Sequence, residues 1–364
     1  MASNATHEPA LATARSNGTA PHIDLVPCAN EAEWDALLAQ RIDATVFHRM
    51  FWLRLIAKRF KADLKPYVVM ADGAVAGLFP AFVYRRGWFR VAVSPPPQTG
   101  TPYLGPLVAP ELQAAVLEAF TRQMKTARVS YIEIRFPPHV TEVPRGFQVE
   151  SRGTHMLDLR PGEDQLWNAA LNSGCRRAVR KATAAGVTIS EGDLSAHLDQ
   201  YFAMAVDVFA KSKRPPVLGR DDYAALAEVA GKGGPVKVLF AWHEGRLVAG
   251  GIFPFDEQAI YYLDGVSDPG GLQVRPNNLL HWEVIRWACA HGLVRYDMIG
   301  AGIESINRFK RGFGAVQVSY TYAYRSLDFL TTAARTTYAL LAPAGRAVQY
   351  AAQRLSKRDT ESVQ

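Results

Sequence analysis

The chain has 364 residues, of which 48% are hydrophobic and 21% charged, and this composition excludes a disordered or fibrous protein. The formal net charge of +7 favours polyanionic partners: phosphorylated cofactors, nucleotide-linked substrates, RNA or an anionic membrane surface. The three cysteines are far apart and form no C-x-x-C pair, so neither a disulfide framework nor a metal site is indicated. A reducing cytoplasm is the simplest location.

The two ends of the chain differ from its middle. Residues 1–20 are polar and lack the apolar core of a secretory signal, so we expect a disordered lead. No uncharged apolar run approaches the roughly 18 residues that span a bilayer. We expect residues 326–364 to form a helical tail, whose basic end suits a peripheral contact with the inner face of the membrane.

Two segments of the chain resemble each other. Residues 68–83 and 238–255 each contain a short apolar strand, a polar turn with glycine and a second strand with a Gly-x-Phe-Pro motif, which predicts a β-hairpin. An amphipathic helix and another strand follow in both places, within residues 111–137 and 277–302. We infer two copies of one α/β (α+β) module. The Pro- and Gly-rich segment 94–106 is predicted to be an extended loop near the surface.

A basic helix is predicted between the two copies. In "CRRAVRKA", Arg176, Arg177, Arg180 and Lys181 are expected to share one helical face, and no acidic residue occurs between Asp164 and Glu191. A surface that serves solubility alone usually mixes both signs of charge. The pattern therefore favours an anion-binding face over a merely solvated one.

The loop at 268–275 precedes a predicted helix that starts at Pro276 and Asn277 or Asn278. Its glycines permit close backbone approach, Arg275 adds charge, and the N–H groups of a helix start favour phosphate. An ordinary strand-to-helix connection is the alternative.

A third cluster follows a predicted strand that ends near Asp297. A Gly300-x-Gly302 turn, Glu304 in a loop and the cations of "RFKRGFG" come to one end of a sheet, where α/β folds bind ligands. A capped turn with a surface lysine is the alternative. No P-loop, G-x-S-x-G elbow or H-E-x-x-H motif is present.

Taken together, "FHRMFWLRLIAKRF", "CRRAVRKATAAGV" and the run that ends in "RFKRGFG" resemble the FemAB-like branch of the Gcn5-related N-acyltransferase (GNAT) superfamily, over roughly residues 22–325. The resemblance implies two tandem GNAT-like domains, each a mixed central sheet flanked by helices, at 21–160 and 161–325. The second domain would carry the active site.

The resemblance also implies an N-acyltransferase that moves an acyl group from a thioester carrier of the acyl-coenzyme A type to an amine. The acceptor would be small or linked to the cell envelope. An aminoacyl-tRNA-dependent aminoacyltransferase of the peptidoglycan-bridge type is the alternative, and a non-catalytic polyanion-binding protein is a second one. No metal and no DNA partner are expected.

Individual roles are carried over by position. Lys310 matches the motif lysine near the donor phosphate and the reacting carbonyl, where it would stabilise an oxyanion. Arg177 and Arg180 match cations associated with substrate phosphates. From the chemistry of the reaction, Asp264, Asp297 or Glu304 would accept the proton of the attacking amine, and a carboxylate or phosphate of the substrate is the alternative acceptor. The further binding candidates are Lys181, Arg275, Asn277, Asn278, Arg308 and Phe313. Arg275-Pro276-Asn277-Asn278 departs from the usual [QR]-x-x-G-x-[GA] pyrophosphate loop.

Overall fold

The structure is a computed structural model that describes residues 21–28, 30–138, 143–210 and 216–335. The expected disordered lead lies outside these residues, as does the tail beyond residue 335. Within residues 326–335, the described part of the tail, residues 329–335 are helical. None of the helices within the described ranges is long and apolar enough to cross a bilayer.

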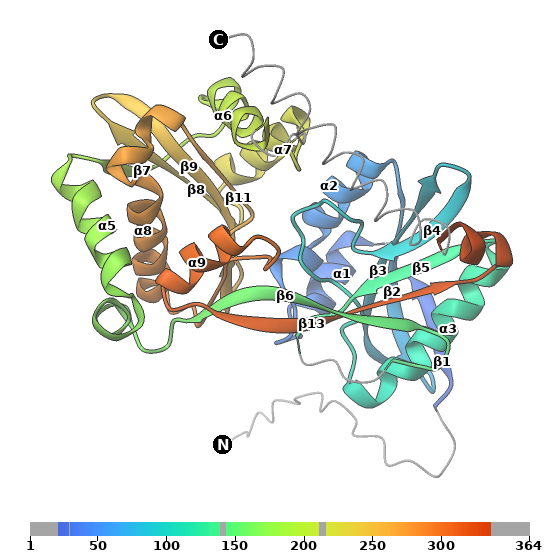
Figure 1. The fold of residues 1–364 in the computed structure, drawn as a ribbon. Helices are drawn as coiled ribbons and strands as arrows, with labels where there is room; N and C mark the ends of the chain where they lie inside the picture. The colour runs from blue at the N-terminus through green and yellow to red at the C-terminus, as the bar shows by residue number, and fades with distance from the viewer. Residues whose placement is uncertain (1–20, 29, 139–142, 211–215, 336–364) are drawn as a thin grey trace, which may run out of the picture.

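The first half of the chain is built on strands with helices on both sides of them (Figure 1). Asn30 caps the first helix, because its side chain accepts a hydrogen bond of 2.9 Å from the backbone N–H of Ala32. The elements are β1 (Ile23–Pro27), α1 (Glu31–Leu38), η1 (Val46–His48), α2 (Met50–Phe60), β2 (Asp63–Ala71), β3 (Ala74–Arg86), β4 (Phe89–Ser94), η2 (Pro110–Leu112), α3 (Gln113–Thr126), β5 (Tyr131–Arg135) and β6 (Gln148–Asp158).

The second half contains more helix. Its elements are α4 (Glu163–Gln165), η3 (Leu166–Ala170), α5 (Ser173–Ala184), β7 (Thr188–Glu191), α6 (Leu198–Ala210), α7 (Arg220–Gly231), β8 (Val236–His243), β9 (Arg246–Pro254), β10 (Ala259–Tyr261), β11 (Asp264–Ser267), η4 (Pro269–Val274), α8 (Pro276–Ala290), β12 (Arg295–Asp297), α9 (Glu304–Gly312) and β13 (Val316–Ser326).

Both predicted hairpins are present. Strand β2 pairs with β3, and β8 pairs with β9, in antiparallel register. The turn residues have positive φ angles in each case, 49° and 82° at Asp72 and Gly73, and 51° and 73° at Glu244 and Gly245. Two successive positive φ angles suit the right-handed twist of the flanking strands, which is why Asp-Gly and Glu-Gly serve here.

A nine-stranded sheet runs through both halves, in the order β1-β2-β3-β4-β5-β13-β6-β12-β10. Strand β13, near the C-terminal end of the described chain, lies between β5 and β6, and the long β6–β13 pair connects the halves (Figure 1). A second sheet has the order β11-β9-β8-β7. The fold is therefore mixed α/β, as predicted, but its largest sheet crosses the expected boundary near residue 160.

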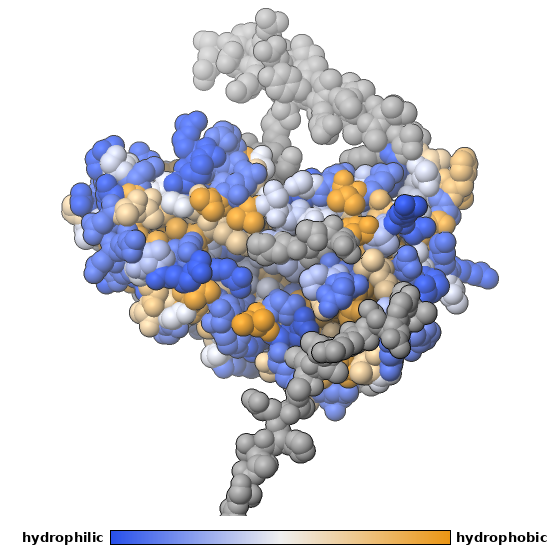
Figure 2. Space-filling view, turned by 90° about the horizontal axis from the view of Figure 1, so that it is seen from below, coloured by the Kyte–Doolittle hydropathy of each residue, from blue (hydrophilic) through white to orange (hydrophobic). Residues whose placement is uncertain are grey.

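The halves share a core and a polar contact. The rings of Phe47 and Tyr261 lie 4.7 Å apart across the junction, and the Tyr103 hydroxyl donates a hydrogen bond of 3.0 Å to Asp297. These contacts fix the first half against the strand ends of the second. Seen from below, hydrophilic residues cover most of the surface, with hydrophobic residues in scattered patches (Figure 2).

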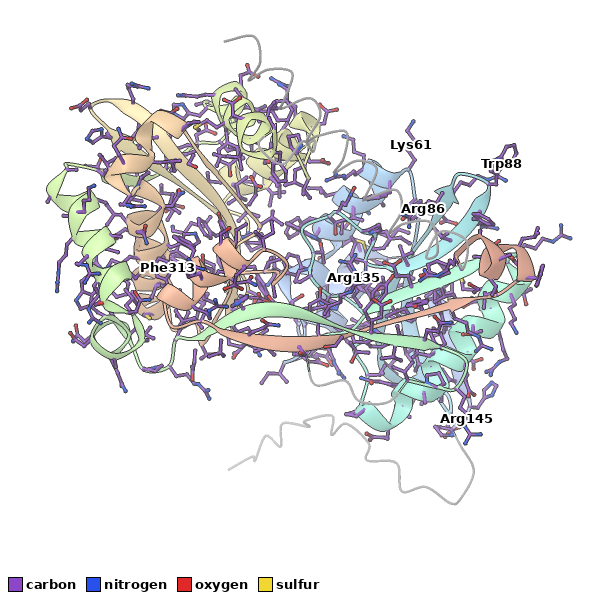
Figure 3. The ribbon with its side chains drawn as sticks, in the orientation of Figure 1. Lys61, Arg86, Trp88, Arg135, Arg145 and Phe313 are labelled. Atoms are coloured by element: carbon purple, nitrogen blue, oxygen red, sulfur yellow. The ribbon has the colours of Figure 1, made fainter. Side chains whose placement is uncertain are left out.

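The loop at 94–106 was predicted to lie near the surface, and this prediction is wrong. Most of its residues are buried. Arg135, labelled near the centre of Figure 3, donates hydrogen bonds to the carbonyl oxygens of Pro95, Pro96 and Thr101 at 2.9, 2.6 and 3.1 Å. The guanidinium satisfies backbone groups that water would otherwise solvate, which is why a Pro- and Gly-rich segment can be buried.

Candidate functional site

Two consecutive strands of the second half, β10 and β11, belong to different sheets. Strand β10 pairs in parallel with β12, whereas β11, three residues further along, pairs with β9 in the other sheet. The change takes place at Tyr262 and Leu263, so β11 leaves the neighbourhood of β12 just where β12 ends at Asp297. The two sheets therefore part at the ends of these strands, and α8 follows the opening after a short 3-10 turn.

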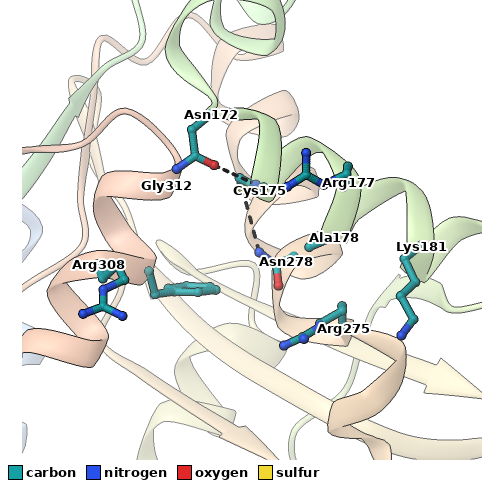
Figure 4. A pocket seen from close by; sticks show the side chains of 11 residues that line it. Asn172, Cys175, Arg177, Ala178, Lys181, Arg275, Asn278, Arg308 and Gly312 are labelled. Atoms are coloured by element: carbon teal, nitrogen blue, oxygen red, sulfur yellow. Dashed lines mark hydrogen bonds between the residues drawn. The ribbon is translucent and has the colours of Figure 1, made fainter.

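Three helices meet around a pocket of about 430 Å³ beside the start of α8 (Figure 4). The volume is that of a small-molecule site. Four cations line it, Arg177 and Lys181 from α5, Arg275 before α8 and Arg308 from α9, and none of the described lining residues is acidic. The remaining lining residues are Asn172, Gly174, Cys175, Ala178, Asn278, Phe309 and Gly312.

Helix α5 presents one narrow face to this pocket. Gly174, Arg177, Ala178 and Lys181 have the spacing i, i+3, i+4 and i+7, which places them in one stripe. The start of the helix is fixed by Asn172, whose side-chain oxygen accepts a hydrogen bond of 2.8 Å from the backbone N–H of Cys175. The small residues leave room, and the two cations supply the charge.

The expectation that four cations share one face of α5 is wrong. Arg176 turns back and donates to the carbonyl oxygens of Trp167 and Asn168, both at 3.2 Å. Arg180 lies over the ring of Trp167, 5.5 Å from its centroid. Successive residues of a helix are rotated by about 100°, so the pair 176/180 points to a different side from the pair 177/181.

The start of α8 closes another side of the pocket. Arg275 has a left-handed backbone (φ 60°) and Pro276 occupies the first helical position. The Asn278 amide lies 3.9 Å from the Cys175 sulfur. Burial raises the pKa of the Cys175 thiol to about 11, so the thiol is neutral near pH 7 and is no ready nucleophile. Asn277 does not line the pocket.

Glu304 was predicted to lie in a loop, but this residue is the first of helix α9. The segment 304–312 is amphipathic, with Asn307 and Lys310 turned inward. Glu304 is exposed and pairs with Arg311, which lowers the pKa of the Glu304 carboxyl. Phe313, just after the helix, is fully buried in the core of the second half, with its ring centroid 5.5 Å from that of His281.

Lys310 is buried at the opening between the sheets. It is 4% exposed, and its ammonium donates hydrogen bonds to the carbonyl oxygens of Ile299 and Gly300, the latter at 2.8 Å. Burial lowers its pKa to about 8, against the attraction of Asp297. The side chain does not line the pocket.

The candidate proton acceptors Asp297, which is buried, and Asp264, which is partly buried, differ in their partners. Asp297 accepts hydrogen bonds from Tyr103, Thr154 and the backbone N–H of Ile299, and burial raises its pKa. Asp264 accepts hydrogen bonds from Tyr201 and Tyr223, at 3.1 and 2.9 Å, which links β11 to α6 and α7. Burial raises its pKa as well. Asp297 lies near Lys310, whereas the partners of Asp264 are tyrosines of α6 and α7.

Residues 171–311 match the family model of an acetyltransferase (GNAT) domain. The matched range contains β10, β11, α8, all of α9 except Gly312, and ten of the eleven residues of the pocket. The chain has a FemAB-like GNAT acyltransferase fold. The match to the acetyltransferase (GNAT) domain model lies in the second half of the chain.

Solved structures with this fold extend over nearly the whole chain. A crystal structure of FemX has a TM-score of 0.68 at 14% identity and covers 86% of this chain and 98% of its own. A tandem GNAT protein from the clavulanic acid biosynthesis pathway has a TM-score of 0.52 at 12% identity, covering 85% and 99%. The structure of L-PGS from Bacillus licheniformis has a TM-score of 0.52 at 14% identity, and the match covers 84% of this chain and 94% of L-PGS. A search of curated protein sequences returned no match.

Sequence reasoning missed part of the pocket. Asn172, Gly174, Cys175, Ala178, Phe309 and Gly312 were not among the predicted site residues. Asn172 stands before a helix as a typical cap, and Gly174 and Ala178 are small residues one turn apart, so a signal for the α5 side was present. No group of three or more metal-ligating side chains occurs within the described ranges.

Proposed function

We propose that this acyltransferase moves an acyl group from a thioester carrier of the coenzyme A type to an amine of a small or envelope-linked acceptor. The pocket with its four cations is the observation that carries the proposal. No acidic residue is present in the described pocket lining to pair with Arg177, Lys181, Arg275 and Arg308. A carrier with several phosphates would supply the negative charge that these cations bind.

The position of the pocket supports this assignment. It lies at the start of α8, where backbone N–H groups and the helix dipole favour a phosphate, and beside the opening between the sheets. A diphosphate bound there would leave the acyl end of a carrier free to extend toward that opening. The sequence at Pro276 differs from the usual pyrophosphate loop, and the cations of α5 and α9 would supply the phosphate contacts instead.

The chemistry needs two kinds of group near the acyl carbon. The amine attacks the carbonyl carbon, the carbonyl oxygen becomes an oxyanion, and collapse of the intermediate expels the thiolate while the amine loses a proton. The buried Lys310 ammonium can donate to the oxyanion. Asp297, held by Tyr103 and Thr154, is the best-placed of the three candidate proton acceptors, since it lies near Lys310.

An aminoacyl-tRNA donor is the second candidate. It rests on the resemblance to the FemAB-like branch and on the missing glycine after Arg275, since the sequence Arg275-Pro276-Asn277-Asn278 differs from the usual coenzyme A loop. The cationic pocket would then hold a phosphate of the tRNA acceptor end or of an envelope precursor.

A transfer assay with both donor classes tests the proposal. The purified protein is incubated with acyl-coenzyme A species or charged tRNAs and candidate amines, with and without nuclease, and products are detected by mass. Acyl transfer that survives nuclease supports the coenzyme A donor, and loss of transfer on nuclease treatment supports the tRNA donor. No transfer by wild type with either donor, together with salt-dependent binding of RNA that is unchanged in Lys310→Ala, would support the non-catalytic alternative.

A further inference from the structure

The hairpin between β3 and β4 carries an exposed tryptophan at its tip. Gly87, with φ 61°, and Trp88 form a two-residue turn between Arg86 and Phe89. Trp88 is 96% exposed and points away from the protein (Figure 3). A turn position tolerates many polar residues, so a large aromatic side chain in water here has no role in folding that the structure shows.

Cations surround this tryptophan. Arg85 and Arg90 are direct cross-strand partners, and both are exposed, as are Arg86 and Lys61. Figure 3 shows Lys61, Arg86 and Trp88 at the same end of the molecule. Like charges directly opposite each other destabilise a hairpin. Arg90 donates a hydrogen bond of 2.7 Å to the carbonyl oxygen of Ala127, and no carboxylate is paired with either arginine in the described structure. An anion that lies against the hairpin reduces the repulsion between the two cations, so the pair favours an anionic partner.

Two further apolar side chains lie at the same end of the sheet. Arg90 at the start of β4 accepts a backbone hydrogen bond from Ser130, and Ser130 accepts one from Leu327, both of 2.8 Å. Phe329 and Leu330 lie two and three residues after Leu327 and are 82% and 72% exposed. The acidic residues nearby are engaged: Asp63 pairs with Lys65, and Asp328 accepts from the backbone N–H of Thr331.

We infer that Arg85, Arg86, Trp88, Arg90, Phe329 and Leu330, here called the basic tip, form a docking surface for an anionic lipid bilayer. Tryptophan, phenylalanine and leucine next to arginines are the composition of surfaces that sit in the headgroup region of a membrane. RNA also attracts arginine and aromatic rings, but Leu330 cannot stack on a base, so the apolar part favours lipid over RNA. The inference does not rest on the acyl transfer chemistry.

Vesicle co-sedimentation of the full chain tests the inference. Vesicles of phosphatidylcholine mixed equally with phosphatidylglycerol are compared with vesicles of phosphatidylcholine alone. We expect binding to the anionic vesicles only, weakening with salt, and a blue shift of tryptophan emission on binding that Trp88→Ser abolishes. The double variant Arg85→Ser/Arg86→Ser is expected to bind about 25-fold more weakly, about fivefold for each cation near the surface.

A matched control removes two exposed cations elsewhere. Lys232 and Arg246 lie in the second half of the chain, and Lys232→Ser/Arg246→Ser lowers the net charge by the same amount. This variant should bind vesicles like wild type. Equal loss of binding in the control, unchanged binding by Trp88→Ser, or no binding of wild type to anionic vesicles would each overturn the inference. A Trp88→Ser effect on tRNA binding or on self-association, with vesicle binding unaltered, would overturn it too.

Discussion

The Lys310 ammonium donates a hydrogen bond of 2.8 Å to the carbonyl oxygen of Gly300, in the turn that leads from β12 to α9. This contact holds the lysine at the ends of the strands while Arg308 and Phe309, on the neighbouring face of α9, reach the pocket. The same short helix thus joins the proposed anion site to the proposed reacting centre. Each part can be tested separately.

Replacing Lys310 should affect turnover first. We expect Lys310→Ala to lower kcat by about a hundredfold or more, because loss of one oxyanion donor costs about 2.7–4 kcal/mol of transition-state stabilisation. The variant also leaves two carbonyl groups short of a donor, and we expect the free energy of unfolding to fall by about 1–3 kcal/mol. Turnover of the folded fraction and urea unfolding measure the two effects. Wild-type turnover in Lys310→Ala would refute the role.

The pKa of Lys310 predicts a pH dependence. With a pKa of about 8, the ammonium is lost as the pH rises above 8, and we expect kcat/KM to fall there by about tenfold per pH unit, a limb that Lys310→Met should lack. Between pH 8 and the ordinary lysine value of 10.5 the unfolded chain binds more protons at this site, so the lysine's contribution to stability rises with pH. A pH–rate profile that is flat from 7 to 9.5 in wild type speaks against the assignment.

Arg177 and Arg180 should differ in their effect on donor binding. Only Arg177 lines the pocket, whereas Arg180 lies over Trp167. We expect Arg177→Gln to raise the dissociation constant of the donor about tenfold or more, the cost of one charge-assisted hydrogen bond, and Arg180→Gln to change it less than about threefold. Isothermal titration of both variants gives the comparison. Equal losses would show that the pocket face of α5 is assigned incorrectly.

Asp264 and Asp297 should separate into one structural and one functional group. Asp264→Asn is expected to lower the free energy of unfolding by about 1–3 kcal/mol, since it weakens the hydrogen bonds from Tyr201 and Tyr223, while the folded enzyme keeps its kcat. Asp297→Asn should lower kcat by about a hundredfold or more. A large fall of kcat in Asp264→Asn with normal stability would reverse the two roles.

The sequence predicts local elements well and long-range arrangement poorly. Turn residues such as Asp72-Gly73 and the helix stop at Gly186 act within a few residues, and the hairpins and α5 follow from them. The insertion of β13 between β5 and β6 depends on pairing between residues that are far apart in the chain, such as Ala323 and Ile134, for which no local signal exists. The continuous sheet was therefore not predictable.

The site shows the same division. The cations of the pocket were predicted because runs without acids and helix starts are local patterns. Which of these cations reach the pocket depends on the direction in which each side chain leaves its helix, and this direction differs between Arg177 and Arg180. The burial of Lys310 was hidden, because lysines are rarely buried and the two carbonyl oxygens that make it possible come from a turn.

The most direct test of the cationic pocket is the dissociation constant of whichever donor supports turnover, measured for the double variant Arg177→Gln/Arg275→Asn. Asparagine tolerates the left-handed backbone at position 275, so the change removes charge without adding strain. We predict binding at least about a hundredfold weaker than in wild type, with an unchanged melting temperature. A dissociation constant within about twofold of wild type would contradict the assignment of the pocket to the phosphates of the donor.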